Sequence, residues 1–553
     1  MNRYLSLIFF ITILFSKKYD DKKIELGNRG NFYKVWIYFK DKIDNKTVNI
    51  TQKANDRRSR NNVESNKIGW NDIYVSSKYK NEITNLGFKI QNESRWLNAI
   101  SIKCQKLDLQ TISSLPFVKK IEPVLLRKKK LPSIDNSYQR LNRIRNYDYG
   151  GSEVQMDQIN CIEAHNQGYY GQGARILYLD TGFDLTHESF DSLNLIAQYD
   201  FINDDELTSN ENEQEVDDAQ DNHGTLCLSV LAGYKEGSLI GPAFKSEFLL
   251  AKTEIVADEI QAEEDNYVAG LEWGEVNGAD ISCSSLGYTD WYEYEDMDGN
   301  TAVTTIAVDI ASSLGVLCVT SAGNSGSDEW NYIVAPADAD SVISVGAVTN
   351  QGIIASFSSR GPTYDGRIKP EVCAMGVGTF CARSNTISEY RTASGTSLSA
   401  PLVGGAAAVI FSAHNSWSAM QIREALMSTA LSSSNPDTNY GYGIINVLDA
   451  INYQNEMGLE NKNNNVNVFN VVKTYPNPFN PSIKIDIDTF QSQNLKIDIF
   501  NIQGKFIENI HDGFVDDTQL KFQWFPNNIT TGIYLIRLSS QSGQTLHKIS
   551  YIK

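Results

Sequence analysis

Five short apolar runs, separated by stretches with helical spacing, constrain the fold of this chain more than any other feature of its sequence. Each run is almost continuously apolar and ends in polar or glycine residues. The runs are ARILYLD (174–180), SEFLLAKT (246–253), ADISCSSLG (279–287), GVLCVTSAGN (315–324) and DSVISVGAV (340–348). Continuous apolar strands that alternate with helices are typical of a parallel sheet buried on both faces. We therefore predict an α/β domain with a doubly wound parallel sheet over residues 146–455, and a site beyond the carboxyl ends of its strands.

The segments on either side of this region have other patterns. Residues 30–125 contain the strand KVWIYF (34–39), a further strand pair, and a short helix followed by a strand, which predicts a small α+β domain. Residues 456–470 are polar and Asn-rich, as expected of a linker. Residues 471–553 contain runs such as SIKIDID (482–488), in which apolar and polar residues alternate, and this alternation predicts a small β-sandwich.

The first residues favour export. Arg3 is followed by an apolar run from Tyr4 to Phe15, which is too short to span a bilayer and predicts a signal peptide at 1–16. A membrane-surface anchor is the alternative. The seven cysteines match no zinc-binding spacing, and Cys373 and Cys381 are close enough in sequence either to form a disulfide or to stay free.

Charge is divided unevenly along the chain. The net charge of −18 argues against nucleic acid or an anionic membrane as a partner. Residues 1–145 hold 30 Lys and Arg against 13 Asp and Glu, a net charge of +17, whereas the remainder holds 19 against 54, a net charge of −35. A basic front segment joined to an acidic body predicts that the two parts bind each other.

The stretch RTASGTSLSAP (391–401) is rich in hydroxyl groups, and a serine hydroxyl attacks a carbonyl only when a base takes its proton. His223 suits this role because it begins the helical segment DNHGTLCLSVLAG, where the helix dipole keeps an imidazole neutral. Asp180 ends the first apolar run, so we expect its carboxylate at the carboxyl edge of the sheet. Alone, the histidine would be read as a core or capping residue and the aspartate as a turn residue. Together with a serine in the order Asp, His, Ser they indicate a catalytic triad.

Ser397 is the candidate nucleophile among these hydroxyl residues. Gly395 and Thr396 precede it, and LSAPLVGGAAAVIFSA continues as a helix of small residues that could pack close to a sheet. At the start of such a helix, the N–H of the serine points toward a developing oxyanion. We expect Asn324, at the end of SAGN, to supply the second oxyanion donor.

These segments resemble a known family. ILYLDTGFDLTH, DNHGT, SAGN and SGTSLSAP are similar to four signature segments of the subtilisin-like serine proteases, and NYGYGIINVLDAI resembles their closing helix. The resemblance covers about 310 residues. It implies that Asp180 orients the histidine, His223 is the general base and then acid, Ser397 is the nucleophile and Asn324 binds the oxyanion. It further assigns Ser285, Leu286, Gly287 and Gly323 to substrate binding.

The flanking domains resemble parts of the same kind of secreted precursor. Residues 30–125 are similar to a subtilase propeptide, which has a ferredoxin-like fold, inhibits the enzyme and is removed by processing that we expect between Val124 and Tyr149. Residues 471–553, opening with YPNPFNP, resemble the C-terminal sorting domain of bacterial type nine secretion, with an immunoglobulin-like spacer as the alternative. The expected protein is a secreted or cell-surface endopeptidase, exported through the periplasm as a zymogen. Its expected partners are polypeptide substrates, its own propeptide and the secretion machinery, and we expect a monomer.

Two other functions and one cofactor need to be weighed. A catalytically silent binding protein would lack a triad residue, and an esterase would need a second glycine at Ser399. We assign no metal ligands and no cofactor. Calcium is possible in the loop 203–222, which contains nine acidic residues, although it lacks the EF-hand spacing and a solvated acidic insertion is favoured.

Overall fold

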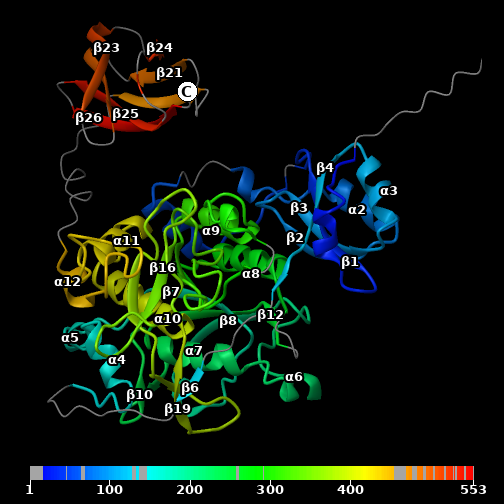
Figure 1. Ribbon diagram of the computed structural model, residues 1–553, viewed down its shortest axis with the longest axis vertical. Helices are drawn as coiled ribbons and strands as arrows, with labels where there is room; N and C mark the ends of the chain where they lie inside the picture. Colours follow the sequence, from blue (N-terminus) through cyan, green and yellow to red (C-terminus); the bar gives the residue numbers. More distant parts are fainter. Residues whose placement is uncertain are drawn as a thin grey trace, which may run out of the picture. The chain divides into compact units, whose positions relative to one another are not determined.

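The computed structural model describes residues 17–44, 46–63, 69–127, 133–135, 146–256, 261–289 and 292–453, and, beyond them, 469–475, 482–489, 493–501, 505–515, 519–526, 529, 532–540 and 543–551. The predicted signal peptide and nearly all of the predicted linker lie outside these residues. The chain forms two compact units that divide after Gln454. The first unit holds an N-terminal domain and the central α/β domain, and the second holds the C-terminal domain (Figure 1).

The central domain is built on a seven-stranded sheet in which every neighbouring pair is parallel. In spatial order its strands are β17 (Val372–Met375), β16 (Ile343–Val348), β15 (Leu317–Ser321), β14 (Ile281–Ser284), β7 (Arg175–Asp180), β11 (Glu247–Lys252) and β8 (Asn194–Asp200). The five apolar runs form β7, β11, β14, β15 and β16, as predicted. Because the chain fills one side of β7 first and then crosses to β14 on the other, the strand order reverses at the β7–β14 pair. A crevice opens beyond the carboxyl ends of the strands at such a reversal.

Helices cover both faces of this sheet, which confirms the doubly wound α/β fold (Figure 1). One face packs against α7 (Asn222–Ala232) and α10 (Thr396–Ala413), and the other against α8 (Glu264–Val276) and α9 (Val303–Ser313). Shorter helices complete the α10 side: α4 (Glu153–Gln158), α5 (Cys161–Asn166), α11 (Ala419–Ser428) and α12 (Val447–Ile451). Among the described helices, α10 alone is long and apolar enough to cross a membrane, and it is a buried core helix of this domain.

The N-terminal domain has the predicted ferredoxin-like α+β fold. Its antiparallel sheet has the order β2 (Ile90–Ser94), β3 (Ala99–Cys104), β1 (Tyr33–Phe39) and β4 (Val118–Pro123), with α2 (Ser77–Asn85) and α3 (Asp108–Ser114) as connecting helices. A further helix, α1 (Gln52–Arg60), lies in a stretch that the sequence pattern marks only as polar. The buried residues of α1 are Ala54, Arg57 and Arg58, so it has no apolar stripe by which to recognise it.

The C-terminal domain is a β-sandwich, as predicted. One sheet contains β20 (Phe469–Tyr475), β21 (Ile483–Thr489) and β24 (Gln519–Trp524), and the other β23 (Phe506–Val515), β22 (Gln493–Asn501), β25 (Gly532–Ser540) and β26 (Gly543–Tyr551). Alternate residues of β21 and β22 are buried in a single core, for example Ile483 and Ile485, while Lys484 between them is exposed. This is the period of two that a half-buried strand requires.

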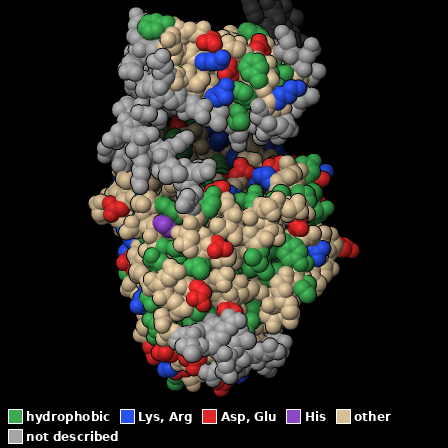
Figure 2. Space-filling view, turned by 90° about the vertical axis from the view of Figure 1, so that its left-hand side faces the viewer, with side chains coloured by type: hydrophobic (Ala, Val, Ile, Leu, Met, Phe, Trp, Pro, Cys, Tyr) green, Lys and Arg blue, Asp and Glu red, His purple; other side chains and the backbone are tan. Residues whose placement is uncertain are grey.

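Basic residues of the N-terminal domain bind acidic residues of α8, as the uneven charge distribution predicts. Arg57 and Arg58 both pair with Glu275, and Arg95 bridges Glu275 and Glu272. These side chains are buried, and their charges are therefore compensated within the precursor. On the outer face shown in Figure 2, by contrast, acidic and basic side chains are scattered among polar and apolar ones.

Two adjacent carboxylates at the start of α8 have different partners at this interface, and their pKa values are shifted in opposite directions. Asp265 pairs with Lys34 at 2.9 Å; burial opposes its charge, but the Lys34 ammonium and hydrogen bonds leave its pKa lowered. Glu264 accepts a hydrogen bond of 2.6 Å from Tyr292, and the backbone N–H of Leu125 also favours its charged form. Burial beneath the N-terminal domain raises the pKa of Glu264 to about 7. Tyr38, Tyr288, Lys23 and Asp265 are further titratable groups around it.

We predict that Glu264 makes the precursor less stable as the pH rises from about 5 to about 8. The pKa of Glu264 is raised in the folded state. Its contribution to the free energy of unfolding is therefore complete below the unfolded-state pKa near 4.5 and is lost as the pH rises through about 7. In the full chain carrying Ser397→Ala, Glu264→Gln should be neutral at pH 5 and stabilising at pH 8, by up to roughly 3 kcal/mol. Asp265→Asn is the matched control and should destabilise at both pH values because Lys34 loses its partner. Thermal unfolding at the two pH values tests both variants, and an equal effect of Glu264→Gln at pH 5 and pH 8 would contradict the prediction.

Candidate active site

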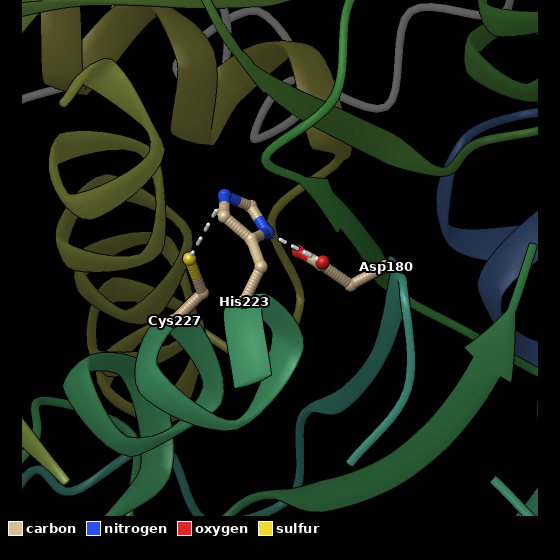
Figure 3. A group of neighbouring side chains, drawn as sticks. All are labelled: Asp180, His223 and Cys227. Carbon is tan, nitrogen blue, oxygen red and sulfur yellow. Dashed lines mark hydrogen bonds and ion pairs between the residues drawn. The ribbon is translucent and has the colours of Figure 1, made fainter. Parts of the chain in front are cut away.

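Asp180 and His223 meet at the carboxyl edge of the sheet. Asp180 is the last residue of β7, and His223 is the second residue of α7. The Nδ1 atom of His223 lies 2.6 Å from Oδ1 of Asp180, and both side chains are buried. Figure 3 shows the imidazole between the Asp180 carboxylate and the Cys227 thiol. With Nδ1–H donating to the carboxylate, Nε2 is the nitrogen left to accept a proton.

A close approach of two backbones makes this contact possible. A Cβ atom on Gly224 would lie 2.1 Å from the carbonyl oxygen of Gly182, so only glycine lets α7 begin beside the end of β7. Gly182 itself has φ of +136°, a conformation that side chains disfavour. The glycines of DTG and HGT thereby bring the aspartate and the histidine together.

Ser397 is the second residue of α10, so its backbone N–H is among those at a helix start that lack an intrahelical acceptor. Its hydroxyl donates to the carbonyl of Ser285 at 3.3 Å. Cys227, one turn after His223 on α7, links the two candidate residues: its sulfur lies 3.2 Å from the carbonyl oxygen of Ser397 and 3.9 Å from Nε2 of His223. The sequence analysis did not single out Cys227, although its spacing of four residues from His223 on a helix is a signal that could have done so.

Asn324 is held in one orientation. Its side-chain oxygen accepts two hydrogen bonds of 2.9 Å from Thr396, one from the backbone N–H and one from the hydroxyl. The amide nitrogen is therefore the end of Asn324 that is left to face other groups. Thr396 is a second residue of this site that the sequence analysis missed, because a hydroxyl next to the candidate nucleophile carries no signal of what it will bind.

The four residues expected to bind substrate lie at the same edge. Ser285, Leu286 and Gly287 directly follow β14, and Gly323 follows β15 just before Asn324. Gly323 has φ of +110°, and a Cβ there would lie 2.8 Å from Cγ1 of Val334 and from Oγ of Ser359. All eight predicted site residues therefore come from the carboxyl ends of β7, β14 and β15 and the first turns of α7 and α10.

Two other histidines of the central domain bind within its interior. His187 contacts Ser189 and the backbone carbonyl of Glu389, which gives it a structural role. His165 lies 2.7 Å from the hydroxyl of Tyr149 and 2.9 Å from the carbonyl of Pro242. Burial lowers the pKa of His165 to about 4.

Comparison with known proteins accounts for this arrangement. Residues 171–443 match the Subtilase family, residues 34–139 the Peptidase S8 propeptide domain of Bacteroidota, and residues 473–553 a secretion system C-terminal sorting domain. Subtilisin DY from Bacillus licheniformis is 32% identical over 302 residues, which are 54% of this chain and 96% of that protein. This chain belongs to the subtilase family. Subtilisin J from Geobacillus stearothermophilus is 26% identical over 452 residues, 81% of this chain and 98% of that protein.

The subtilase is accordingly a secreted serine endopeptidase made as a zymogen, with its own propeptide as an internal partner. Its C-terminal domain is a sorting domain for type nine secretion, which exports proteins to the cell surface or the medium. The basic N-terminal domain that binds α8 is the propeptide.

The acidic loop of the subtilase surrounds a lysine. Asp200, Glu211 and Glu215 offer oxygen atoms within 4.8 Å of one another, close enough for a metal ion. The buried ammonium of Lys252 lies 2.8 Å from Asp200 and 3.0 Å from Glu215. Burial disfavours this ammonium, but Asp200 and Glu215 more than compensate, so the pKa of Lys252 is raised. A calcium ion at these carboxylates would lie against the ammonium, so the donor set does not fit calcium. The favoured alternative of a purely solvated insertion is also incomplete, since α6 (Glu213–Asp217) contributes one of these partners.

The cysteines of the subtilase form no disulfide bonds. All seven are buried and unbridged, including Cys373 and Cys381, for which the sequence left a disulfide open. The Cys373 sulfur donates to the carbonyl of Tyr440 and the Cys381 sulfur to that of Arg391, each at 3.5 Å.

We expect Lys252→Met to lower the free energy of unfolding by about 3–5 kcal/mol, because it leaves buried carboxylates without their counter-charge. The same variant removes the ammonium group that competes with calcium. Millimolar calcium should therefore reduce the difference in free energy of unfolding between the variant and the wild type. Denaturant unfolding with calcium and with chelator measures both effects in the Ser397→Ala background. Lys245→Met, which removes an exposed lysine, is the control. A Lys252→Met variant as stable as the wild type would show that the cluster contributes no net stability.

Proposed function

We propose that this subtilase hydrolyses peptide bonds through an acyl-enzyme formed on Ser397, with His223 as general base and then acid and Asp180 as its orienting group. The observation that carries the proposal is the 2.6 Å contact between Nδ1 of His223 and Asp180 at the edge where Ser397 begins α10. This contact leaves Nε2 to take the serine proton during attack and to return it to the leaving amine.

The oxyanion of the tetrahedral intermediate would be bound by two donors. One is the backbone N–H of Ser397 at the start of α10, where the helix dipole also favours negative charge. The other is the side-chain amide of Asn324, whose oxygen is already engaged by Thr396. Donors fixed before the reaction need no reorganisation as the charge develops.

The substrate would bind as an extended polypeptide along the strand edges that border the site. The propeptide gives a precedent within the chain, because its strand β5 (Leu126–Arg127) pairs antiparallel with β13 (Gln261–Glu263). A second propeptide strand, β6 (Ser133–Asp135), pairs antiparallel with β19 (Tyr390–Ser394), the strand that leads to Ser397. Addition of a strand at such an edge supplies affinity through the backbone and leaves sequence preference to pockets. Since one chain contributes every group of the site, we propose that the enzyme acts as a monomer.

Ser397→Ala should abolish both processing and labelling by a fluorophosphonate probe. The wild-type chain should be cut between Val124 and Tyr149 and then react with the probe, because both steps need the same nucleophile. Intact mass followed over time, beside in-gel fluorescence, measures the two events. Ser399→Ala, which removes another hydroxyl from the same stretch, is the matched control and should behave as the wild type.

Two results would contradict this proposal. Equal labelling of the Ser397→Ala variant would assign the reactive hydroxyl to another residue. If the wild type stays full length and unlabelled, the triad is inactive in this chain and the alternative of a catalytically silent binding protein applies.

Asn324→Leu should lower kcat by about 100- to 1000-fold with little change in KM, because the lost donor acts on the oxyanion rather than on the bound peptide. Thr396→Val should give a smaller loss in kcat, since the Asn324 amide keeps its hydrogen bond to the Thr396 backbone. Steady-state kinetics on a peptide amide distinguishes the two. A rise in KM at constant kcat would place Asn324 in substrate binding instead.

A further inference from the structure

The carbonyl of the proposed nucleophile lacks its usual helical partner. In an α-helix the carbonyl of Ser397 would accept from the N–H of residue 401, but that residue is a proline inside α10 and has no N–H. A buried carbonyl without a donor costs free energy, so the surrounding structure must supply one. Ser285 Oγ does so at 2.8 Å, and Cys227 adds its weaker S–H donor at 3.2 Å.

The serine that supplies this hydrogen bond is itself held by a buried tyrosine. The hydroxyl of Tyr178 lies 2.9 Å from Oγ of Ser285. A carbonyl can only accept, so Ser285 uses its single proton on Ser397. In the contact with Tyr178, Ser285 must then be the acceptor and Tyr178 the donor. The result is a one-way relay in which Tyr178 donates to Ser285 and Ser285 donates to the carbonyl of Ser397.

Tyr178 reaches this position because of its place in the sheet. It lies on β7 two residues before Asp180, and residues two apart in a strand point to the same face. The side chain is fully buried, and its ring packs edge-on against Phe183 with the centroids 6.0 Å apart. One strand therefore carries the group that orients His223 and a group directed at Ser397.

Ser285 holds the nucleophile at two points. Its side chain donates to the Ser397 carbonyl, while its own carbonyl accepts from the Ser397 hydroxyl at 3.3 Å. A rotation of the Ser285 side chain would release the first contact, and a shift of its backbone would alter the second. Hydrogen bonds in a buried chain strengthen one another, so the Tyr178 donor strengthens the bond that Ser285 makes to Ser397.

We propose that Tyr178 is a positioning residue for the nucleophile, which acts through the Ser285 hydroxyl to fix the Ser397 peptide at the start of α10. The inference rests on the proposed role of Ser397. Tyr178 touches neither the substrate nor the reacting atoms, so its effect is on the rate of acylation and not on substrate binding.

Tyr178→Phe keeps the ring and removes only the hydroxyl. We expect the second-order rate of fluorophosphonate labelling and kcat to fall about three- to tenfold, the value of one net hydrogen bond, with KM unchanged. Tyr149→Phe is the matched control, because it removes another buried tyrosine hydroxyl from the same core, one that contacts His165. The control should keep wild-type kinetics when rates are divided by the amount of folded, processed enzyme.

A double-mutant cycle separates positioning from packing. If Tyr178 acts through Ser285, the Tyr178→Phe change should have no further effect on the labelling rate in the Ser285→Ala background. An equal loss in both backgrounds would show that Tyr178 acts by packing, and the relay would be wrong. Ser397→Ala is measured beside these variants: if it still labels, the proposed function itself fails, whatever Tyr178 does.

A rescue experiment tests the relay from the other end. Pro401→Ala gives residue 401 an N–H that can donate to the Ser397 carbonyl, so the Tyr178→Phe change should reduce the rate less in this background. If Tyr178→Phe reduces the labelling rate as much with alanine at position 401 as with proline, the effect of Tyr178 does not act through the Ser397 carbonyl. Should Tyr178→Phe fail to fold, Ser285→Ala with and without Pro401→Ala gives the same comparison.

Discussion

The pairing of β7 with β14, at the point where the strand order reverses, is the constraint on which the rest of this structure depends. It places the end of one strand, with Asp180, beside the end of another, with Ser285. The helix α10 then has to begin at this crevice and run across the sheet. It can do so because its middle is small: a Cβ at Gly404 would lie 2.8 Å from the sulfur of Cys283 in β14. The glycines that the sequence showed as a small-residue stretch are thus what allows the nucleophile to reach its position.

Sequence reasoning predicted much of the fold and the places of Asp180, Asn324, His223 and Ser397 at strand ends and helix starts, because those features are local. A continuous apolar run predicts a buried parallel strand independently of its surroundings, and the five runs form five of the seven strands of the sheet. Asp180, His223 and Asn324 could be placed because each stands at the junction of an apolar run or helix with a glycine-containing turn. The resemblance to subtilases then joined these separate signals into one site.

The features that the sequence did not predict depend on contacts between distant segments. The helix α1 is held by Arg57 and Arg58, whose burial requires Glu275 more than two hundred residues away. Lys252 ends an apolar strand like any other polar residue, and only the folded chain shows it among the carboxylates of the acidic loop. The same holds for Thr396 and Tyr178, since a hydroxyl reveals nothing in sequence about the group that it will bind.

The ion pairs between the propeptide and α8 join two parts of the chain that separate when a zymogen is processed. Glu272 and Glu275 are buried by Arg95 and Arg57 in the precursor, and removal of the propeptide returns them to water. These glutamates therefore occur first in the precursor and then in the mature enzyme, and the propeptide arginines are their partners only in the precursor. A substitution at these positions could improve the mature protease and still be eliminated by selection. It would remove the ion pairs that the glutamates make in the precursor. The acidic residues of α8 therefore reflect the requirements of the contact with the propeptide, which the mature enzyme no longer contains.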